Sequence, residues 1–330
     1  MIEYNLKNMR VWSRLGPSGA LGIAAMELAE INDKVLMLTS DLCFFSGLER
    51  FEKEYPDRIY NFGIAEQNMV GAAGGLAKEG FVPFANSYAS FCCSRCADQV
   101  RVNMSYMKLP IKLIGLTAGF AAGILGATHT AVEDIAVMRA LPGMVVLSPA
   151  DGTEIIKCMF AAAKTKEPTY IRLTGIADLP VVYQKDYDYQ IGKAIELRQG
   201  SDICFIATGS MVFSSLKAAE LLEEKGISSS VINMHTLKPL DCEAVDKAVG
   251  RHKLIVTVEE HNVIGGLGAA VAEYLAEKTE HIPQLLLGIK DKFVSAGSYL
   301  YQIEQAELSI EQISKKTLEK YRSVSGGGIN

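Results

Sequence analysis

Short, continuous apolar runs alternate along the chain with longer segments in which apolar residues recur every three or four positions. The segment from Gly16 to Ile31 has this helical spacing and predicts an amphipathic helix, whereas the run from Lys34 to Thr39 is typical of a strand buried on both faces. Strands that alternate with helices predict βαβ units and a mostly parallel sheet covered by helices on both faces. Further runs of the same kind are Val82–Phe84, Ile111–Leu116, Met144–Leu147 and Tyr170–Leu173.

A second alternating series begins at Ser201, after a stretch from Thr174 in which Gly, Pro, Tyr and Asp replace the periodic pattern. We therefore expect an α/β chain with two doubly wound, mostly parallel sheets. The predicted boundaries are a first domain at residues 1–175, a linker at 176–200 and a smaller second domain at 201–330. The apolar runs of the second series are Ile203–Thr208, Ser230–Asn233 and Leu254–Val258.

Composition supports this picture and narrows the class of partner. With 330 residues, 49% hydrophobic and 22% charged, the chain is large enough for two packed cores. The net charge of −5 and the lack of a basic block disfavour nucleic acid as a partner. No apolar run has the length of a signal peptide or a membrane span, and the seven cysteines have no disulfide spacing, so we expect a cytoplasmic chain that contacts no membrane.

Ligands of an open parallel sheet bind beyond the carboxyl ends of its strands, so the residues that follow the strands are the candidates for chemistry. Glu66 follows one predicted strand and opens a helix that is rich in Gly and Ala. A carboxylate in a first helical turn is often only a partner of the helix dipole. The small residues around Glu66 also indicate that another surface packs closely on this helix.

His129 stands after a glycine-rich loop and before Thr130-Ala131-Val132-Glu133, a capping-box pattern that predicts a helix capped by Thr130. It is either a loop histidine that bonds its own backbone or a group that shuttles a proton or donates to a substrate oxygen.

Two other motifs favour structure over chemistry. Cys92, Cys93 and Cys96 include one C-x-x-C, but no second pair or nearby His completes a metal site, so we expect helix packing and no metal. The turn Gly265–Gly268 lacks the dinucleotide spacing, and neither a phosphate-binding P-loop nor a G-x-S-x-G motif occurs.

The run from Phe62 to Phe84 closely resembles the pyrimidine-binding domain of transketolases, and further matching runs extend the resemblance over nearly the whole chain. Val258-Glu259-Glu260 with the turn Gly265–Gly268 resembles the C-terminal domain of the same family. The other matching runs are Ser87–Arg101, Gly126–Ala136 and Arg139–Met144.

This resemblance implies specific roles. Glu66 would hydrogen-bond N1′ of the aminopyrimidine of thiamine diphosphate and promote the imino tautomer, whose 4′-nitrogen takes the proton from thiazolium C2, while the cofactor carries the chemistry. Tyr88 and Phe91 would stack on the pyrimidine, and His129 would face substrate oxygens. Of the remaining cofactor positions, Asp41 would lie by the thiazolium, Ile64 belongs to the cofactor-binding run, and Ser94 stands where the family has a third aromatic residue.

The family holds the diphosphate through Mg²⁺ or another divalent cation at a G-D-G…N motif of a separate N-terminal domain, and no G-D-G occurs here. The sequence thus resembles the C-terminal-half subunit of a split transketolase. That resemblance implies a partner chain with the metal and diphosphate site, a heterotetramer with two copies of each chain, and two-carbon ketol transfer between sugars.

Several positions that usually grip a sugar phosphate have changed, which predicts a donor or acceptor other than the common pentose phosphates unless the partner supplies cations. Two alternatives stay open: a 2-oxo acid dehydrogenase β-type subunit or a 1-deoxyxylulose-phosphate synthase-like enzyme, and a scaffold without cofactor. The changed positions are Phe44-Phe45, Ala118-Gly119-Phe120, Leu125 and Gly175.

Overall fold

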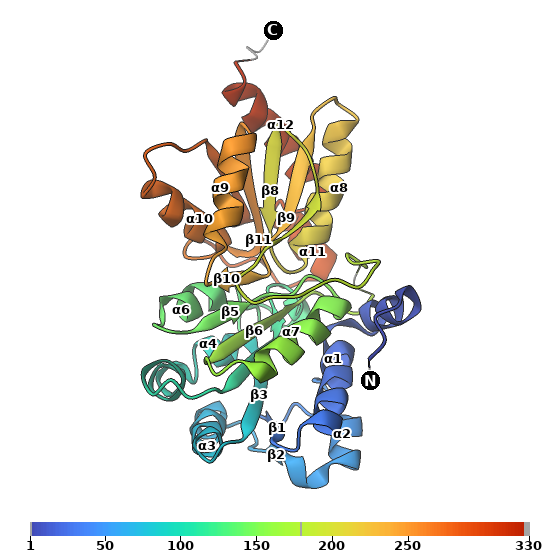
Figure 1. Ribbon diagram of the computed structural model, residues 1–330, viewed down its shortest axis with the longest axis vertical. Coiled ribbons are helices and arrows are strands. Elements are labelled where there is room, and N and C mark those ends of the chain that lie inside the picture. The colour runs from blue at the N-terminus through green and yellow to red at the C-terminus, as the bar shows by residue number, and fades with distance from the viewer. Residues whose placement is uncertain (1, 179, 327–330) are drawn as a thin grey trace.

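The computed structural model describes residues 2–178 and 180–326 and consists of two α/β layers stacked along the long axis of the molecule (Figure 1). The first sheet has the strand order β10-β5-β6-β4-β3-β1-β2, and its strands are parallel apart from β10, which runs antiparallel to β5. Its strands are β1 (Val35–Thr39), β2 (Ile59–Asn61), β3 (Val82–Tyr88), β4 (Lys112–Ala118), β5 (Val145–Leu147), β6 (Thr169–Thr174) and β10 (Thr236–Lys238).

The second sheet has the order β12-β11-β8-β9-β7, with β7 antiparallel to β9 and the other pairs parallel. Both sheets are therefore mostly parallel and flanked by helices, which confirms the predicted α/β class. The strands are β7 (Ile195–Arg198), β8 (Ile203–Ala207), β9 (Ser229–Asn233), β11 (Leu254–Asn262) and β12 (Gln284–Ile289).

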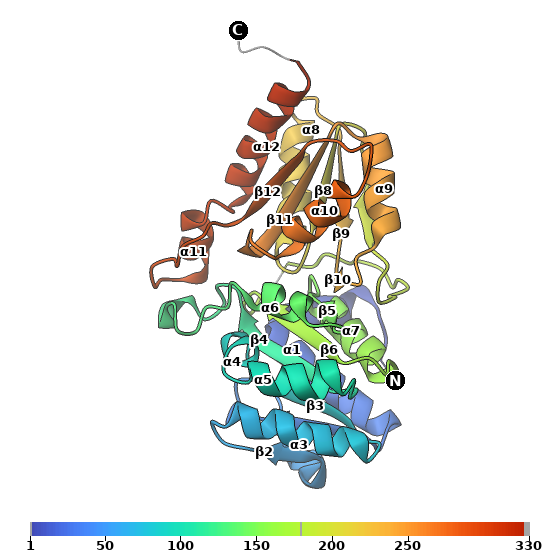
Figure 2. The same ribbon diagram turned by 90° about the vertical axis from the view of Figure 1, so that its left-hand side faces the viewer.

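Helices cover both faces of the first sheet. α1, α2 and α7 share one apolar core with it, while α3 to α6 and the π-helical turn η2 lie over the opposite face (Figure 2). In the chain's first half the helices are α1 (Leu6–Ile31), α2 (Glu49–Glu54), α3 (Glu66–Lys78), α4 (Ala89–Cys93), α5 (Ala97–Gln99), η2 (Val100–Tyr106), α6 (Asp134–Ala140) and α7 (Gly152–Lys164), with short 3₁₀ turns η1 (Pro56–Arg58) and η3 (Gly123–Leu125). The second sheet carries α8 (Met211–Glu223), α9 (Cys242–Arg251), α10 (Leu267–Ala276), α11 (Tyr299–Gln305) and α12 (Ile310–Val324).

The structure differs from the sequence prediction at several elements. α1 begins at Leu6, capped by Asn5, and consists of two helical segments joined at a kink, where Gly16 is non-helical with φ 74° and lies against the backbone of Ala177. The second segment starts where the sequence predicts a helix, whereas the segment before Gly16 was not predicted; a side chain at Gly16 would meet the Ala177 backbone, so this kink needs glycine. Strands β7, β10 and β12 were not predicted, and β7 lies inside the predicted linker at 176–200. A three-residue edge strand such as β10 leaves no pattern long enough to recognise.

No helix in the described parts of the chain is both long and apolar enough to cross a membrane.

Candidate active site

Glu66 lies at the carboxyl edge of the first sheet, where a short loop leads from β2 into α3. The turn at Gly63 has φ 65°, which a glycine adopts without strain and which lets the chain reverse into the helix. Glu66 then occupies the first position of α3 and is only 2% exposed. Its carboxylate accepts a hydrogen bond from the Ser87 hydroxyl at 3.0 Å, so a charged group is held in the interior at a fixed orientation.

Three aromatic rings surround the approach to this carboxylate. Tyr88 ends β3, Phe91 lies in α4, and His129 stands in the loop after η3. The ring centroids are 6.0 Å apart for Tyr88 and Phe91, 5.7 Å for Tyr88 and His129, and 5.3 Å for Phe91 and His129. Burial raises the pKa of the Tyr88 hydroxyl, so this ring stays neutral. The site therefore offers flat, uncharged faces beside a buried acceptor.

The helix after His129 starts later than its capping-box pattern predicts. α6 begins at Asp134 with Glu133 as its N-cap, and the Glu133 carboxylate accepts instead from the backbone of Val132. The capping box at Thr130 is therefore wrong. The physical reason is that Ala131 bridges to the end of β4, and this extended pairing prevents a helical turn there. The imidazole Nδ1 of His129 lies 2.9 Å from the Thr128 hydroxyl, a contact between side chains rather than the bond to its own backbone that was one of the two expectations.

The other predicted cofactor positions lie around this cluster. Asp41 follows β1 with φ 60°, and its backbone N–H donates to the Asn61 side chain at 3.0 Å, which fixes the turn while the carboxylate stays exposed. Ile64 is 75% exposed in the loop before α3. Ser94 is exposed just after α4, and its hydroxyl donates to the Ser90 carbonyl. Their roles toward a cofactor stay predictions.

Arg95 is the contact that sequence reasoning missed. Its Nη1 lies 2.9 and 2.8 Å from the two carboxylate oxygens of Glu66, and its guanidinium stacks on Phe91 with Cζ 4.0 Å from the ring centroid. A signal was available, because a carboxylate predicted to be buried calls for a cationic or hydrogen-bonding partner. Arg95 lies inside the C-x-x-C segment Cys93–Cys96, where the cysteines are the more conspicuous feature.

These residues fit an aminopyrimidine: a buried carboxyl group can share a proton with a ring nitrogen, and aromatic faces flank the place. They do not fit a diphosphate-bound cation, because no cluster of three His, Cys, Asp or Glu able to hold a metal occurs within residues 2–178 and 180–326. A metal-bound diphosphate would therefore need ligands from another chain or domain.

Contacts from the second sheet hold the loops of this site. Glu260, at the end of β11, accepts the backbone N–H of Phe120 at 2.6 Å and the hydroxyls of Ser210 and, at 2.6 Å, Tyr299. Arg172 donates from β6 to the Glu260 carbonyl at 2.9 Å. The second domain thus fixes the segment after β4 that leads to His129.

The remaining sequence candidates have structural roles. Cys92, Cys93 and Cys96 are buried free thiols in the core beneath α4, and burial raises the pKa of all three, as expected for packing residues. The amides of Leu267 and Gly268 donate to the Glu259 carboxylate at 2.6 and 2.8 Å, so this turn already holds an anion and offers no phosphate site.

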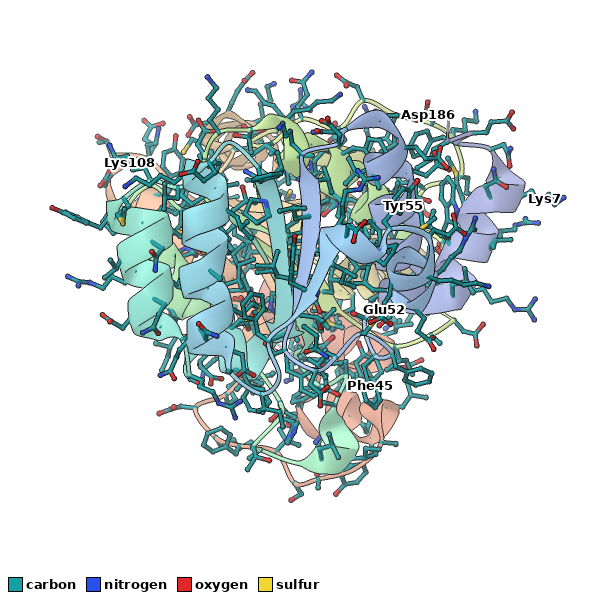
Figure 3. All side chains as sticks on the ribbon, turned by 90° about the horizontal axis from the view of Figure 1, so that it is seen from below. Lys7, Phe45, Glu52, Tyr55, Lys108 and Asp186 are labelled. Atoms are coloured by element: carbon teal, nitrogen blue, oxygen red, sulfur yellow. The ribbon has the colours of Figure 1, made fainter. Side chains whose placement is uncertain are left out.

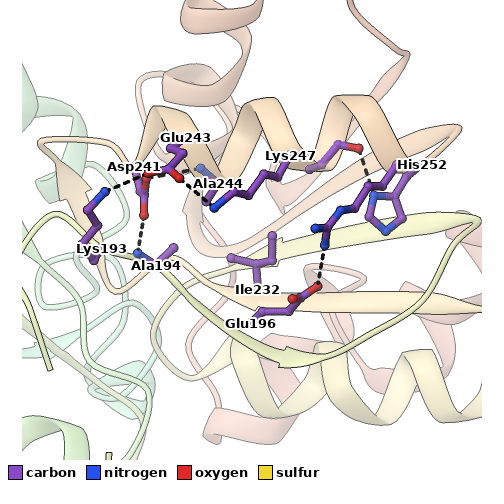
Figure 4. Close-up of a pocket in the computed structure, with 11 residues that line it drawn as sticks. Lys193, Ala194, Glu196, Ile232, Asp241, Glu243, Ala244, Lys247 and His252 are labelled. Atoms are coloured by element: carbon purple, nitrogen blue, oxygen red, sulfur yellow. Dashed lines mark hydrogen bonds and ion pairs between the residues drawn. The ribbon is translucent and has the colours of Figure 1, made fainter. Parts of the chain in front are cut away.

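A cavity of about 230 Å³ lies between α9 and β7, on the side of the second domain (Figure 4). Its charged side chains pair with one another: Lys193 and Lys247 contact Glu243, and Arg251 lies 3.9 Å from Glu196. This internal neutralisation leaves no excess charge for a ligand, so the cluster around Glu66 remains the candidate active site.

Comparison with known proteins gives the class of chain. Residues 17–176 match the pyrimidine binding domain of transketolase, and residues 192–313 match the transketolase C-terminal domain. The chain therefore belongs to the transketolase family and corresponds to its pyrimidine-binding and C-terminal half, as the resemblance implied.

Individual relatives agree. A protein described as a transketolase C-terminal section from Methanocaldococcus jannaschii is 37% identical over 91% of this chain and 95% of its own length. A subunit of a 6-deoxy-6-sulfo-D-fructose transketolase from Clostridium sp. strain MSTE9 is 37% identical over 89% of this chain and 91% of its own. A solved structure described as a split gene transketolase, inactive beta4 tetramer, superposes with a TM-score of 0.85 at 36% identity and covers 94% of this chain and 99% of that one.

Proposed function

We propose that this chain is the pyrimidine-binding subunit of a cytoplasmic thiamine-diphosphate-dependent transketolase that is active only with a partner subunit. The observation that carries the proposal is the buried carboxylate of Glu66 beside three aromatic rings, in a chain that resembles split-transketolase subunits over nearly its full length. Glu66 hydrogen-bonds N1′ of the aminopyrimidine, sharing a proton with it, and Tyr88 and Phe91 stack on the ring. The bound cofactor supplies the electron sink for two-carbon ketol transfer.

The rest of the site's chemistry is assigned to substrate handling and to the partner. His129 orients substrate oxygens and exchanges a proton with them. The partner, an N-terminal-half subunit, contributes the divalent cation and the diphosphate contacts. We place two copies of each chain in an α2β2 assembly, because each cofactor would lie between one copy of each subunit.

Exposed apolar side chains at the rim of the site support a protein partner there. They follow the carboxyl ends of the first sheet's strands, and Phe45 is labelled on the lower right of the molecule in Figure 3. Large apolar side chains that are exposed together on one surface often mark a protein–protein interaction site. The residues are Phe44, Phe45, Ile64, Ile124 and Leu125, each between 51% and 76% exposed.

The substrate is proposed to be a sugar, phosphorylated or otherwise modified, that differs from the common pentose phosphates. Phe120 is buried, Leu125 is apolar, and a Cβ at Gly119 would lie 2.2 Å from a Glu260 oxygen, so the loop after β4 cannot present a cation at these positions. Loss of charged partners weakens phosphate binding. Efficient turnover of xylulose 5-phosphate with ribose 5-phosphate by the reconstituted pair would refute this part.

The test of the core proposal begins with co-purification of candidate partners, followed by calorimetric measurement of thiamine diphosphate binding in the presence of Mg²⁺. We expect binding by the pair and not by this chain alone. Glu66→Ala should lower ketol transfer by the reconstituted pair about 100-fold or more, in the range of a lost proton-transfer group. Glu79→Ala, an exposed glutamate at the other end of α3, is the matched control.

The same preparation separates the alternatives. Decarboxylation of 2-oxo acids without ketol transfer would favour the dehydrogenase or synthase class instead. If Glu66→Ala retained nearly full ketol transfer, Glu66 would not be the cofactor-activating group. If neither the chain nor any partner complex bound the cofactor, the chain would be a scaffold without cofactor and not an enzyme subunit.

A further inference from the structure

The guanidinium of Arg95 makes two contacts at once that a bound aminopyrimidine would also need. Its Nη1 bridges both oxygens of Glu66 at 2.9 and 2.8 Å, and its plane lies over Phe91 with Cζ 4.0 Å from the ring centroid. A guanidinium and an aminopyrimidine protonated at N1′ are both flat groups that donate N–H bonds to a carboxylate and stack on an aromatic face. The two groups compete for one place, because the guanidinium occupies both carboxylate oxygens of Glu66 and a face of Phe91.

We propose that Arg95 is a gate: it occupies the pyrimidine place in the unliganded subunit and turns out of it when the cofactor binds. This inference rests on the proposed function and adds a conformational step to it. The step moves one side chain and leaves the carboxylate in position, because the Ser87 hydroxyl still donates to Glu66 when the guanidinium has left.

The burial of the two partners shows which one can move. Glu66 is 2% exposed, fixed at the start of α3, whereas the Arg95 side chain is 37% exposed and follows the short helix α4. A flexible side chain at the surface can rotate into solvent, while a buried carboxylate cannot leave without moving its helix. The opening motion therefore belongs to Arg95.

The closed state lowers the apparent affinity for the cofactor. A hydrogen bond between two charged groups is stronger than a neutral one, and the closed state spares Glu66 the cost of an unpaired buried charge. When the competent state is only fractionally populated, the apparent dissociation constant rises by the inverse of that fraction. A closed state favoured about tenfold would therefore weaken binding about tenfold.

The experiment measures thiamine diphosphate binding with Mg²⁺ by calorimetry on the complex of this chain with its partner. Arg95→Met keeps an unbranched stem against Phe91 and removes the competing guanidinium. We expect its dissociation constant to fall about tenfold or more relative to wild type. Arg10→Met, the same change at an exposed position of α1, is the control and should leave binding at the wild-type value.

A tighter complex after Arg95→Met cannot arise from structural damage, which weakens binding. Equal or weaker binding by this variant would overturn the gate, because it would mean that Arg95 does not compete with the cofactor or even assists it. If the wild-type pair itself bound no cofactor, the proposed function would fail first. Binding by wild type without a gain in Arg95→Met would reject the gate alone.

A second measurement tests the closed state directly on the free subunit. Without the cofactor, Arg95→Met leaves Glu66 buried and unpaired, so its melting temperature should lie below that of Arg10→Met. Equal melting temperatures would show that the ion pair does not hold the free subunit, and would count against the gate.

Discussion

Arg172 is a cation that is 1% exposed, and it connects three separate segments of the chain. Its Nε donates to Asp134 at 2.8 Å, and its Nη2 donates to the carbonyls of Ala131 and Glu260 at 3.3 and 2.9 Å. The first two acceptors belong to the segment after His129, and the third belongs to the second domain. One side chain thus joins the substrate-facing loop to the domain contact.

Removal of this cation should strongly destabilise the chain. Arg172→Met leaves Asp134, which is fully buried, without its counter-ion, so we expect the free energy of unfolding to fall by about 3–5 kcal/mol. Arg14→Met is the control, because Arg14 and Asp178 form an exposed pair and its loss should cost less than about 1 kcal/mol. Urea denaturation of both variants measures the difference, and equal losses would contradict the assignment.

Local sequence identifies a candidate site residue more readily than it identifies the residues that contact it in the fold. Glu66 could be singled out because it follows a strand and opens a helix, a placement that depends only on local sequence. Arg95 could not be paired with Glu66 in the same way, since the two are 29 residues apart and meet only when α3 and α4 pack on one sheet face. Long-range pairs of this kind depend on the tertiary structure.

At the level of elements, most buried strands of both sheets were predicted, because long apolar runs have few other interpretations. β3 and β11 extend four residues beyond their predicted ends, and β12 was not predicted. The ends of helices were predicted less well. The kink at Gly16, the delayed start of α6 and the edge strand β10 each depend on contact with a distant segment. The common cause is the close approach of two backbone segments. A glycine in the sequence indicates where such an approach is possible, but not which segment approaches.

Gly22 is another glycine whose neighbour the sequence does not reveal, and it allows a test of the packing. It lies within α1, and a Cβ at this position would be 2.2 Å from the Gly47 carbonyl oxygen in the loop after β1. Gly22→Ala should therefore destabilise the chain by about 1–3 kcal/mol through overpacking. Gly71→Ala in α3, where nothing lies within 4 Å, should instead stabilise by up to about 1 kcal/mol through helix propensity. Thermal melting distinguishes the two, and the same sign for both would contradict this packing.

At the scale of the whole molecule, the second domain acts as the support of the active-site loops rather than as a separate ligand-binding unit. Its buried polar groups at the ends of β11 point toward the first domain: Glu260 holds Phe120, and His261 Nε2 accepts the backbone N–H of Ile135 at 3.1 Å. The sequence gives no pattern for such a contact, because buried polar residues at a domain boundary look like polar surface residues until both partners are known.

The domain contact at His261 should make stability depend on pH. Burial lowers the pKa of His261 to about 4, because Nε2 must stay unprotonated to accept from Ile135 and the site cannot solvate a charge. The unfolded chain titrates near about 6.5. Between these values the unfolded state binds a proton that the folded state does not, so the free energy of unfolding falls as pH drops from about 6.5 toward about 4.

His261→Gln retains a side-chain acceptor but removes this titration. Wild type should therefore lose stability relative to His261→Gln by up to about 1.4 kcal/mol per pH unit across that window. Glu259, whose pKa burial raises to about 7, acts in the opposite direction and lies 3.8 Å from His261 Nδ1, so the two proteins are compared in a Glu259→Gln background to isolate His261. Urea denaturation at about pH 7, 6 and 5 measures it. If the free energies of unfolding of wild type and His261→Gln changed in parallel with pH, His261 would not be held neutral at the domain contact. The second domain would then support the His129 loop through Glu260 and Arg172 alone.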